Sequence, residues 1–389
     1  MRILWILIVC IGLLTYAITA NACPFCNGSG ETLSQDVRSA SMILFGTLKN
    51  ARLDPKEYAQ GATDLEIEVV IKADPILGDR KVITLPKYWP ATDPKNPGKF
   101  LVFCDVYQGK IDPYKGFPFK GDSHIASYLK GSLGIKDKDL ATRLKFFFDY
   151  LDDPDSSIAH DAYNEFSAAD YKDFRPIAEK LPADRIIKWL NDPNTPASRY
   201  GLYGSMLGHC GKPADAPVLL AIIDDPARRT ITGLDGVLAG LTLLTPTEGW
   251  RKTSDVLADS KKEHLIRFAA LKAAEFLWEF RPDVIPRDQI GESVCRMLEQ
   301  PDIADLAIEK LGKWNYWKCA DRVIALSKKP EFNNNLVHRA IMRYALRCPA
   351  NSSAVVTAYL TEQRKQHPET VKDMESFLAS ESGISAPGK

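Results

Sequence analysis

Leu151-Asp152-Asp153-Pro154 is the stretch that decides the fold, because its pattern returns along the chain. An aliphatic residue, two acids or amides and a proline stand again at 190–193, 223–226 and 298–301, with weaker echoes at 257–260 and 326–330. The last residues of successive copies are 29 to 41 residues apart. This spacing is typical of stacked helical hairpins.

The pattern has the chemistry of a joint between two helices. An apolar helix ends on the aliphatic residue, the acids can cap the exposed amides of the next helix, and proline in a first helical turn needs no N–H partner. The segment 264–278 after one echo places apolar residues at three- and four-residue steps, which is a helical period. We therefore expect the paired acids to be helix caps rather than metal ligands or acid–base catalysts.

The stretch from about 140 to about 364 resembles HEAT-type repeats, because each joint is followed by an apolar helix with alanine at close-packing positions. A single repeat of this type cannot bury its own apolar face, so neighbours stack into one continuous core. The resemblance implies an α-α superhelix of five or six hairpins over 133–366. A C-terminal helix and a disordered tail are expected over 367–389.

The region 23–132 has a different period. Short apolar runs, the second of them strictly alternating at first, are separated by glycine and proline, which favours a small β-barrel or sandwich. The runs are 41–48, 64–72, 81–85 and 99–106. The fold class predicted from the sequence is therefore α+β, with a small N-terminal barrel followed by a helical solenoid.

This region resembles the netrin-like domain, the OB-type barrel shared with tissue inhibitors of metalloproteinases. The resemblance rests on Cys23 and Cys26, on the strands 43–48 and 65–72, and on the segment 98–104. It implies a disulfide between Cys104 and either Cys23 or Cys26. In that family the N-terminal cysteine chelates the zinc of a target protease through its amine and carbonyl groups, which would give this role to Cys23. The chain has Cys-Pro-Phe-Cys where family members commonly begin Cys-x-Cys.

Residues 1–22 have the features of a secretory signal peptide. Arg2 precedes a nearly continuous apolar run, and Ala20-Asn21-Ala22 is a small-x-small cleavage site. Cleavage is favoured over an uncleaved anchor, because the apolar run is short for a spanning helix and lacks flanking charges that would fix one. Cleavage would make Cys23 the mature N-terminus of a secreted, periplasmic or cell-envelope protein with no membrane span. Lipoprotein signals also end just before cysteine, so a lipid anchor on Cys23 remains an alternative, although Ala20 stands where such signals usually carry an aliphatic residue.

The sequence contains eight cysteines, and cleavage of the signal peptide would remove Cys10. A structural bridge is the favoured role of Cys23 and Cys26, with redox chemistry and metal binding as alternatives, since Cys-x-x-Cys spacing occurs in all three. Buried thiols are the default for the cysteines in or at the ends of predicted helices, which are Cys210, Cys295, Cys319 and Cys348. Cys319 and Cys348 are also candidates for a bridge.

Composition and motifs give no positive sign of catalysis. Lys plus Arg and Asp plus Glu number 50 each, so no basic field would hold nucleic acid. His-Glu-x-x-His does not occur, and the glycines from Gly201 to Gly208 lie in an apolar helical segment that follows no strand, unlike a phosphate-binding loop. We expect no catalytic residue, cofactor or resident metal.

Trp314, Tyr316 and Trp317 are the binding candidates, because aromatic clusters beside cations often anchor partners; packing of a turn between helices is the alternative. The favoured function is a non-catalytic scaffold with an unidentified protein partner. A protease inhibitor acting through Cys23 is the second hypothesis. A thiol–disulfide protein using Cys23 and Cys26 is the third.

Overall fold

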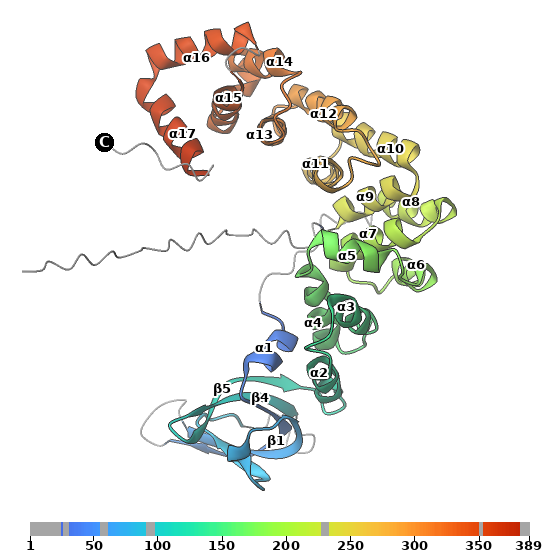
Figure 1. Ribbon diagram of the computed structural model, residues 1–389, viewed down its shortest axis with the longest axis vertical. Helices are drawn as coiled ribbons and strands as arrows, with labels where there is room; N and C mark the ends of the chain where they lie inside the picture. Colours follow the sequence, from blue (N-terminus) through green and yellow to red (C-terminus); the bar gives the residue numbers. More distant parts are fainter. Residues whose placement is uncertain are drawn as a thin grey trace, which may run out of the picture.

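The structure is a computed structural model that describes Phe25 and residues 31–54, 61–90, 98–226, 233–349 and 353–381. An antiparallel sheet is followed by a long array of helices, which confirms the α+β prediction (Figure 1). The predicted signal peptide, Cys23, Cys26 and the tail after residue 381 lie outside the described residues.

The sheet has five strands in the order β3-β2-β1-β4-β5. Because β3 and β5 are both edges, the sheet is open, and the expectation of a closed barrel is wrong. The edges are poorly suited to closure: β3 has four residues, and β5 carries Pro113 and Pro118, which have no N–H to donate. The strands are β1 (Met42–Leu53), β2 (Gly61–Lys72), β3 (Val82–Leu85), β4 (Lys99–Tyr107) and β5 (Lys110–Phe119).

Both faces of the sheet are apolar, as the alternation along β1 shows. Met42 and Leu44 point into one core with residues of β2, β3 and β4. Ile43 and Phe45 point to the opposite face and join a core that includes helices α1 (Leu33–Ser39) and α2 (Ile125–Gly134). This second core continues through the helical array, so the sheet and the array share buried apolar surface.

The array follows as fifteen further α-helices among the described residues. They are α3 (Leu140–Phe148), α4 (Ser156–Ser167), α5 (Tyr171–Ala178), α6 (Ala183–Asn191), α7 (Tyr200–Cys210), α8 (Ala216–Asp224), α9 (Leu234–Leu244), α10 (Pro246–Ala258), α11 (His264–Phe280), α12 (Arg287–Cys295), α13 (Ala304–Lys313), α14 (Ala320–Ala325), α15 (Asn335–Arg347), α16 (Ala354–Gln366) and α17 (Pro368–Glu381).

Figure 1 shows these helices in an arc of two rows. The outer row is α3, α6, α8, α10, α12, α14 and α16, and the inner row is α4, α5, α7, α9, α11, α13, α15 and α17. Contacts between α7 and α9, between α9 and α11, and between α13 and α15 join neighbours within the inner row. Every copy of the sequence pattern lies at the end of an outer helix or of the short 3-10 turn that extends this helix. The prediction that the pattern joins two helices is therefore confirmed.

The capping role expected for the acids is wrong at three of these joints. Helix α4, for example, is capped by Asp155, which lies beyond the Leu151–Pro154 stretch. The acids instead pair with side chains of the next outer helix, because stacking brings one joint beside the following repeat. Asp152 accepts hydrogen bonds from Arg185 and Trp189 at 2.8 and 2.7 Å, Asp224 pairs with Lys252 at 2.6 Å, and Glu299 pairs with Arg322 at 3.0 Å.

Helices α7 and α9 pack backbone to backbone. Glycines at 201, 204 and 208 are matched by glycines at 233, 236 and 240, so the same spacing occurs twice. A Cβ added to Gly204 would lie 2.8 Å from the Cα of Val237, and one added to Gly208 would lie 2.6 Å from the Cα of Gly240. The glycines therefore permit a close helix crossing.

A buried polar cluster attaches helices α1 and α2 to the array. Asp161 of α4 accepts hydrogen bonds from the Leu33 amide at 2.5 Å, from Ser34 Oγ at 2.7 Å and from Tyr128 Oη at 2.7 Å. Burial raises the pKa of Asp161, and these hydrogen bonds oppose that shift. The first turn of α1 is thereby fixed to α4.

Candidate interaction surface

A stacked tryptophan pair lies where two inner helices end. Trp278 is near the end of α11 and Trp314 follows α13; their ring centroids are 4.5 Å apart with planes 10° from parallel. Arg287 donates from Nε to the Trp278 carbonyl at 3.1 Å and lies over the Trp278 ring at 5.7 Å. Both tryptophans are half-buried. We call Trp278, Trp314 and Arg287 the aromatic patch.

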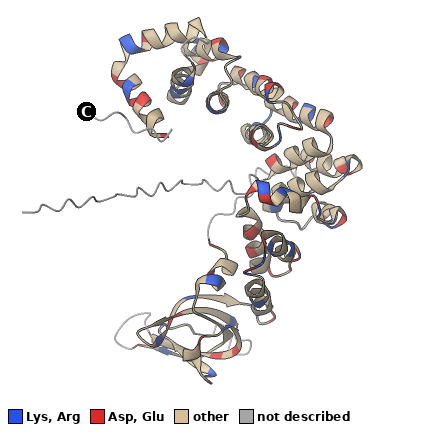
Figure 2. Ribbon diagram, viewed as in Figure 1, with Lys and Arg blue, Asp and Glu red and all other residues tan. Residues whose placement is uncertain are grey.

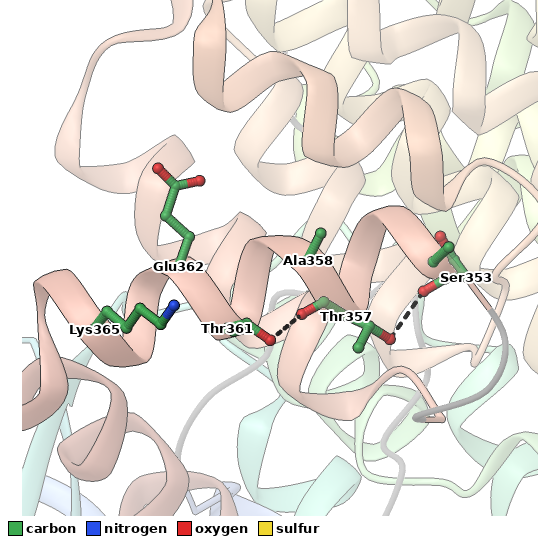
Figure 3. A pocket seen from close by; sticks show the side chains of 7 residues that line it. Ser353, Thr357, Ala358, Thr361, Glu362 and Lys365 are labelled. Carbon is green, nitrogen blue, oxygen red and sulfur yellow. Dashed lines mark hydrogen bonds between the residues drawn. The ribbon is translucent and has the colours of Figure 1, made fainter.

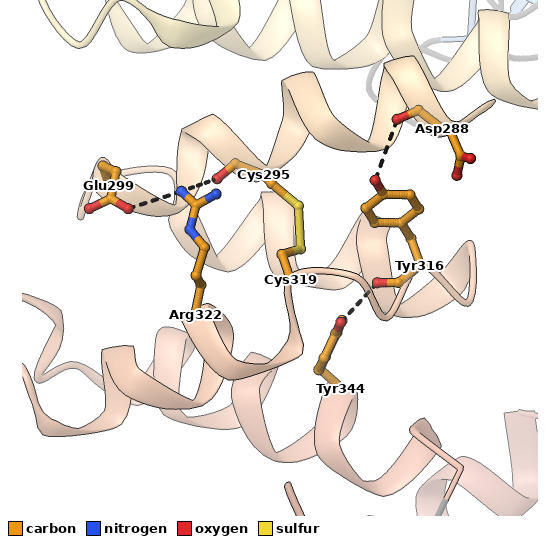
Figure 4. The surroundings of a disulfide bond; sticks show 7 residues. All are labelled: Asp288, Cys295, Glu299, Tyr316, Cys319, Arg322 and Tyr344. Atoms are coloured by element: carbon orange, nitrogen blue, oxygen red, sulfur yellow. Dashed lines mark hydrogen bonds and ion pairs between the residues drawn. A yellow bond between two sulfur atoms is a disulfide. The ribbon is translucent and has the colours of Figure 1, made fainter. Parts of the chain in front are cut away.

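The other two aromatic candidates pack the adjoining turn. Tyr316 is 5% exposed; its Oη donates to the Asp288 carbonyl at 3.4 Å, and its own carbonyl accepts from Tyr344 Oη at 2.8 Å (Figure 4). Trp317 meets the Tyr344 ring at 4.9 Å in an edge-on contact. Tyr316 also meets the Trp278 ring edge-on at 6.1 Å, but it is buried, so Trp314 is the half-buried candidate that we assign to the aromatic patch.

A ladder of ion pairs connects successive inner helices. Glu275 of α11 pairs with Lys310 of α13, Glu309 of α13 pairs with Arg343 of α15 at 3.2 Å, and Arg343 also pairs with Glu381 of α17 at 2.9 Å. Burial alone would raise the pKa of Glu275, but hydrogen bonds from Lys310 and Lys272 lower it. Figure 2 shows acids and bases interspersed along the described helices, so this surface has mixed charge.

The disulfide of the array differs from the expected one. Cys319 is bonded to Cys295, with a Cα–Cα distance of 6.5 Å, and Cys348 is buried outside this bond (Figure 4). The expected Cys319–Cys348 bridge is therefore wrong. The end of α12 lies beside the start of α14, and Arg322 strengthens this connection by donating to the Cys295 carbonyl at 3.0 Å.

Cys104 is a free thiol, so the disulfide that the netrin-like resemblance implied for it is wrong. Its side chain points into the sheet core and is fully buried. Burial raises the pKa of the Cys104 thiol to about 12. A thiol in this environment is chemically inert at neutral pH.

The described histidines that have acidic or hydroxyl neighbours do not assemble a nucleophilic site. His124 contacts Asp153 at 2.9 Å, but Ser123 donates to Asp155 instead of to His124. His209 is bonded at both ring nitrogens, to Ser205 and to Tyr171, and burial lowers its pKa to about 4.

Within the described ranges, no group of three or more His, Cys, Asp or Glu side chains could hold a metal ion. None of the helices described is long and apolar enough to cross a membrane.

A hollow with a volume of about 760 Å³ lies along α16 in the outer row (Figure 3). Small and polar side chains line it, including Ser353, Ala358 and Thr361. Thr361 Oγ1 donates to the Thr357 carbonyl at 2.8 Å, so this hydroxyl already has a partner within the helix. The hollow is open and shallow, unlike the concave, largely enclosed pockets that hold small molecules.

The chain is an α+β protein in which an antiparallel sheet is followed by a two-row helical array, and the aromatic patch lies on this array. Comparisons of the chain with protein-family models, with curated proteins and with solved structures find no match.

Two parts of this surface were missed from the sequence. Trp278 and Arg287 were not among the candidates, although Trp278 lies about one repeat length before Trp314. In stacked repeats, residues one period apart occupy neighbouring positions. The repeat spacing was therefore a usable signal for the partner of Trp314.

Proposed function

We propose that the protein is an exported, non-catalytic interaction scaffold. In this proposal the helical array is a HEAT-type superhelix that binds a protein partner along its inner row. The sheet is a netrin-like or OB-type module that adds a second contact. Repeat arrays commonly bind partners on the extended surface that stacking creates.

The observation that carries the proposal is the aromatic patch at the end of the inner helices. Tryptophan and arginine are the residue types most enriched at the centres of protein interfaces. The Trp278–Trp314 stack and the bond from Arg287 to the Trp278 carbonyl hold the patch in one arrangement. Such preorganisation reduces the entropy that a side chain loses when a partner binds.

The ion-pair ladder supports a protein as the class of partner. Its carboxylates and cations neutralise one another from α11 to α17, so it offers no field of one sign to a polyanion. A partner with an apolar anchor and charges of both signs would match the aromatic patch and the ladder together.

The protease-inhibitor and thiol–disulfide hypotheses both depend on Cys23, which lies outside the described residues. Mass analysis of the mature N-terminus tests the first, because an acylated or uncleaved Cys23 cannot chelate zinc through its amine. Counting reactive thiols at Cys23 and Cys26 tests the second, because a stable bridge excludes thiol exchange there.

Affinity capture from the native exporting cell tests the scaffold proposal. Wild-type protein should recover a partner, Trp314→Ala should lose most of it, and Val355→Ala should retain it. Val355 is a matched control because it is an exposed apolar residue on the outer helix α16. Repeated capture of no protein, or equal recovery by both variants, would contradict the proposal.

A further inference from the structure

The Phe25 side chain packs on helices that lie far from it in the sequence. Its side chain is 4% exposed, and its ring centroid lies 4.6 Å from that of Phe276 in α11. Phe276 is itself buried, and Tyr171 of α5 contacts it edge-on at 5.0 Å. Phe280 is 5.8 Å from Phe276 and 4.8 Å from Tyr171. Phe25 therefore packs, through Phe276, on a cluster of aromatic side chains from two inner-row helices; we call Tyr171, Phe276 and Phe280, together with Gly201 beside Phe25, the aromatic pocket.

The backbone of α7 is shaped to admit this residue. A Cβ added to Gly201 would lie 3.0 Å from the Phe25 carbonyl oxygen and 3.0 Å from the Cα of Gly233. Gly233 has a φ of 103°, which favours glycine and lets the chain turn beside Gly201. A larger residue at 201 would press against Phe25 on one side and α9 on the other.

The same N-terminal segment has a second attachment on the array. The first turn of α1 is bonded to Asp161 of α4 through Leu33 and Ser34. Phe25 and α1 thus contact different inner helices within ten residues of sequence. Phe25 and the first turn of α1 are therefore two separate attachment points on the array.

We propose that the aromatic pocket of Tyr171, Phe276, Phe280 and Gly201 is a docking site for an extended peptide carrying phenylalanine, and that this chain's own N-terminal segment occupies it in cis. The pocket offers ring faces and edges to an aromatic side chain, and Gly201 offers close approach to the peptide backbone. The site is distinct from the aromatic patch. Binding at this site can be tested without identifying the protein that binds the aromatic patch.

Because Phe25 belongs to the same chain as the pocket, its effective concentration sets how tightly the free segment must bind. A segment joined to its own binding site through a few residues has an effective concentration on the order of millimolar. Occupancy of about nine-tenths in cis therefore requires the free segment to bind the empty pocket with a Kd of about 0.1 mM or tighter, and such a segment weakens binding of a competing peptide about tenfold.

The test adds the segment in trans to the full chain. A fluorescent peptide of residues 22–31, carrying Cys23→Ser and Cys26→Ser, is titrated against wild-type protein and against Phe25→Ala, with binding followed by fluorescence anisotropy. Phe25→Ala should bind the peptide at least about tenfold more tightly than wild type, because its pocket is empty. The control peptide with the additional change Phe25→Ala should bind neither protein.

Equal binding to both proteins, equal binding of both peptides, or no binding to Phe25→Ala up to about 1 mM would overturn the inference. Circular dichroism checks that Phe25→Ala is folded. Phe25→Leu serves as a second variant that keeps part of the apolar contact, and it should bind the peptide with intermediate affinity. Loss of partner capture in the earlier experiment would leave these titrations unchanged, so the two proposals fail separately.

Discussion

Replacement of Gly208 by alanine tests the close crossing of α7 and α9 on which the inner row is built. The new Cβ would lie 2.6 Å from the Cα of Gly240 and 2.9 Å from its carbonyl oxygen. Carbon atoms in contact are normally separated by about 3.5–4.0 Å. The two helices would therefore have to move apart by about 1 Å.

The expected magnitude follows from two opposing terms. Overpacking of a well-packed site typically costs about 1–3 kcal/mol, and the upper end applies because the atoms that meet the new Cβ are backbone and cannot rotate away. Alanine gains about 1 kcal/mol over glycine in a helix. We expect Gly208→Ala to lower the free energy of unfolding by about 2 kcal/mol.

Urea unfolding followed by circular dichroism measures this change. Gly134→Ala is the matched control, because Gly134 ends helix α2 and a Cβ there would meet nothing within 4 Å. The control should be unchanged or slightly more stable. If Gly208→Ala were as stable as Gly134→Ala, the crossing would not be as close as the structure shows.

Three further predictions concern buried groups. The pKa of His209 is depressed to about 4, so between about pH 6.5 and pH 4 the unfolded chain binds a proton that the folded chain does not. The free energy of unfolding should therefore fall by up to about 3 kcal/mol from pH 7 to pH 4. Urea unfolding should show a smaller fall for His209→Gln than for the wild type. Non-reducing peptide mapping should recover Cys295 linked to Cys319, and Cys295→Ser should lower the unfolding free energy by about 3 kcal/mol; a Cys319–Cys348 peptide would refute this pairing. Asp161→Asn should destabilise the attachment of α1 by about 2 kcal/mol, and unchanged urea unfolding would count against its role.

The joints between helices could be predicted from the sequence because their signals are local. An aliphatic helix end and a proline act within a few residues, and the structure ends a helical segment of the outer row at every copy. The partners of the acids could not be predicted in the same way. Asp152 bonds Trp189 and Glu299 bonds Arg322 because one repeat stacks on the next, which is a tertiary contact.

In the sheet, too, a strand could be predicted from local sequence, whereas the pairing of distant edges could not. Alternation along 64–72 identifies a strand, and the structure places β2 there. Closure of a barrel depends on whether two distant edges can pair, and the short β3 and the prolines of β5 leave the sheet open.

The contacts that were missed share one spacing. Trp278 stacks on Trp314, Glu275 pairs with Lys310, and Gly204 meets α9 at Val237, each across roughly one repeat. A search for complementary residues one period apart would have found these pairs. The docking of Phe25 has no such signal, because the segment lies outside the repeats.

Cross-linking of the captured complex by an amine-reactive reagent shows directly whether the partner binds along the inner row. Partner peptides should be linked to Lys272 and Lys313 on the inner row, and Lys188 and Lys252 on the outer row should give few such links. Links concentrated on Lys188 and Lys252 would contradict binding along the inner row.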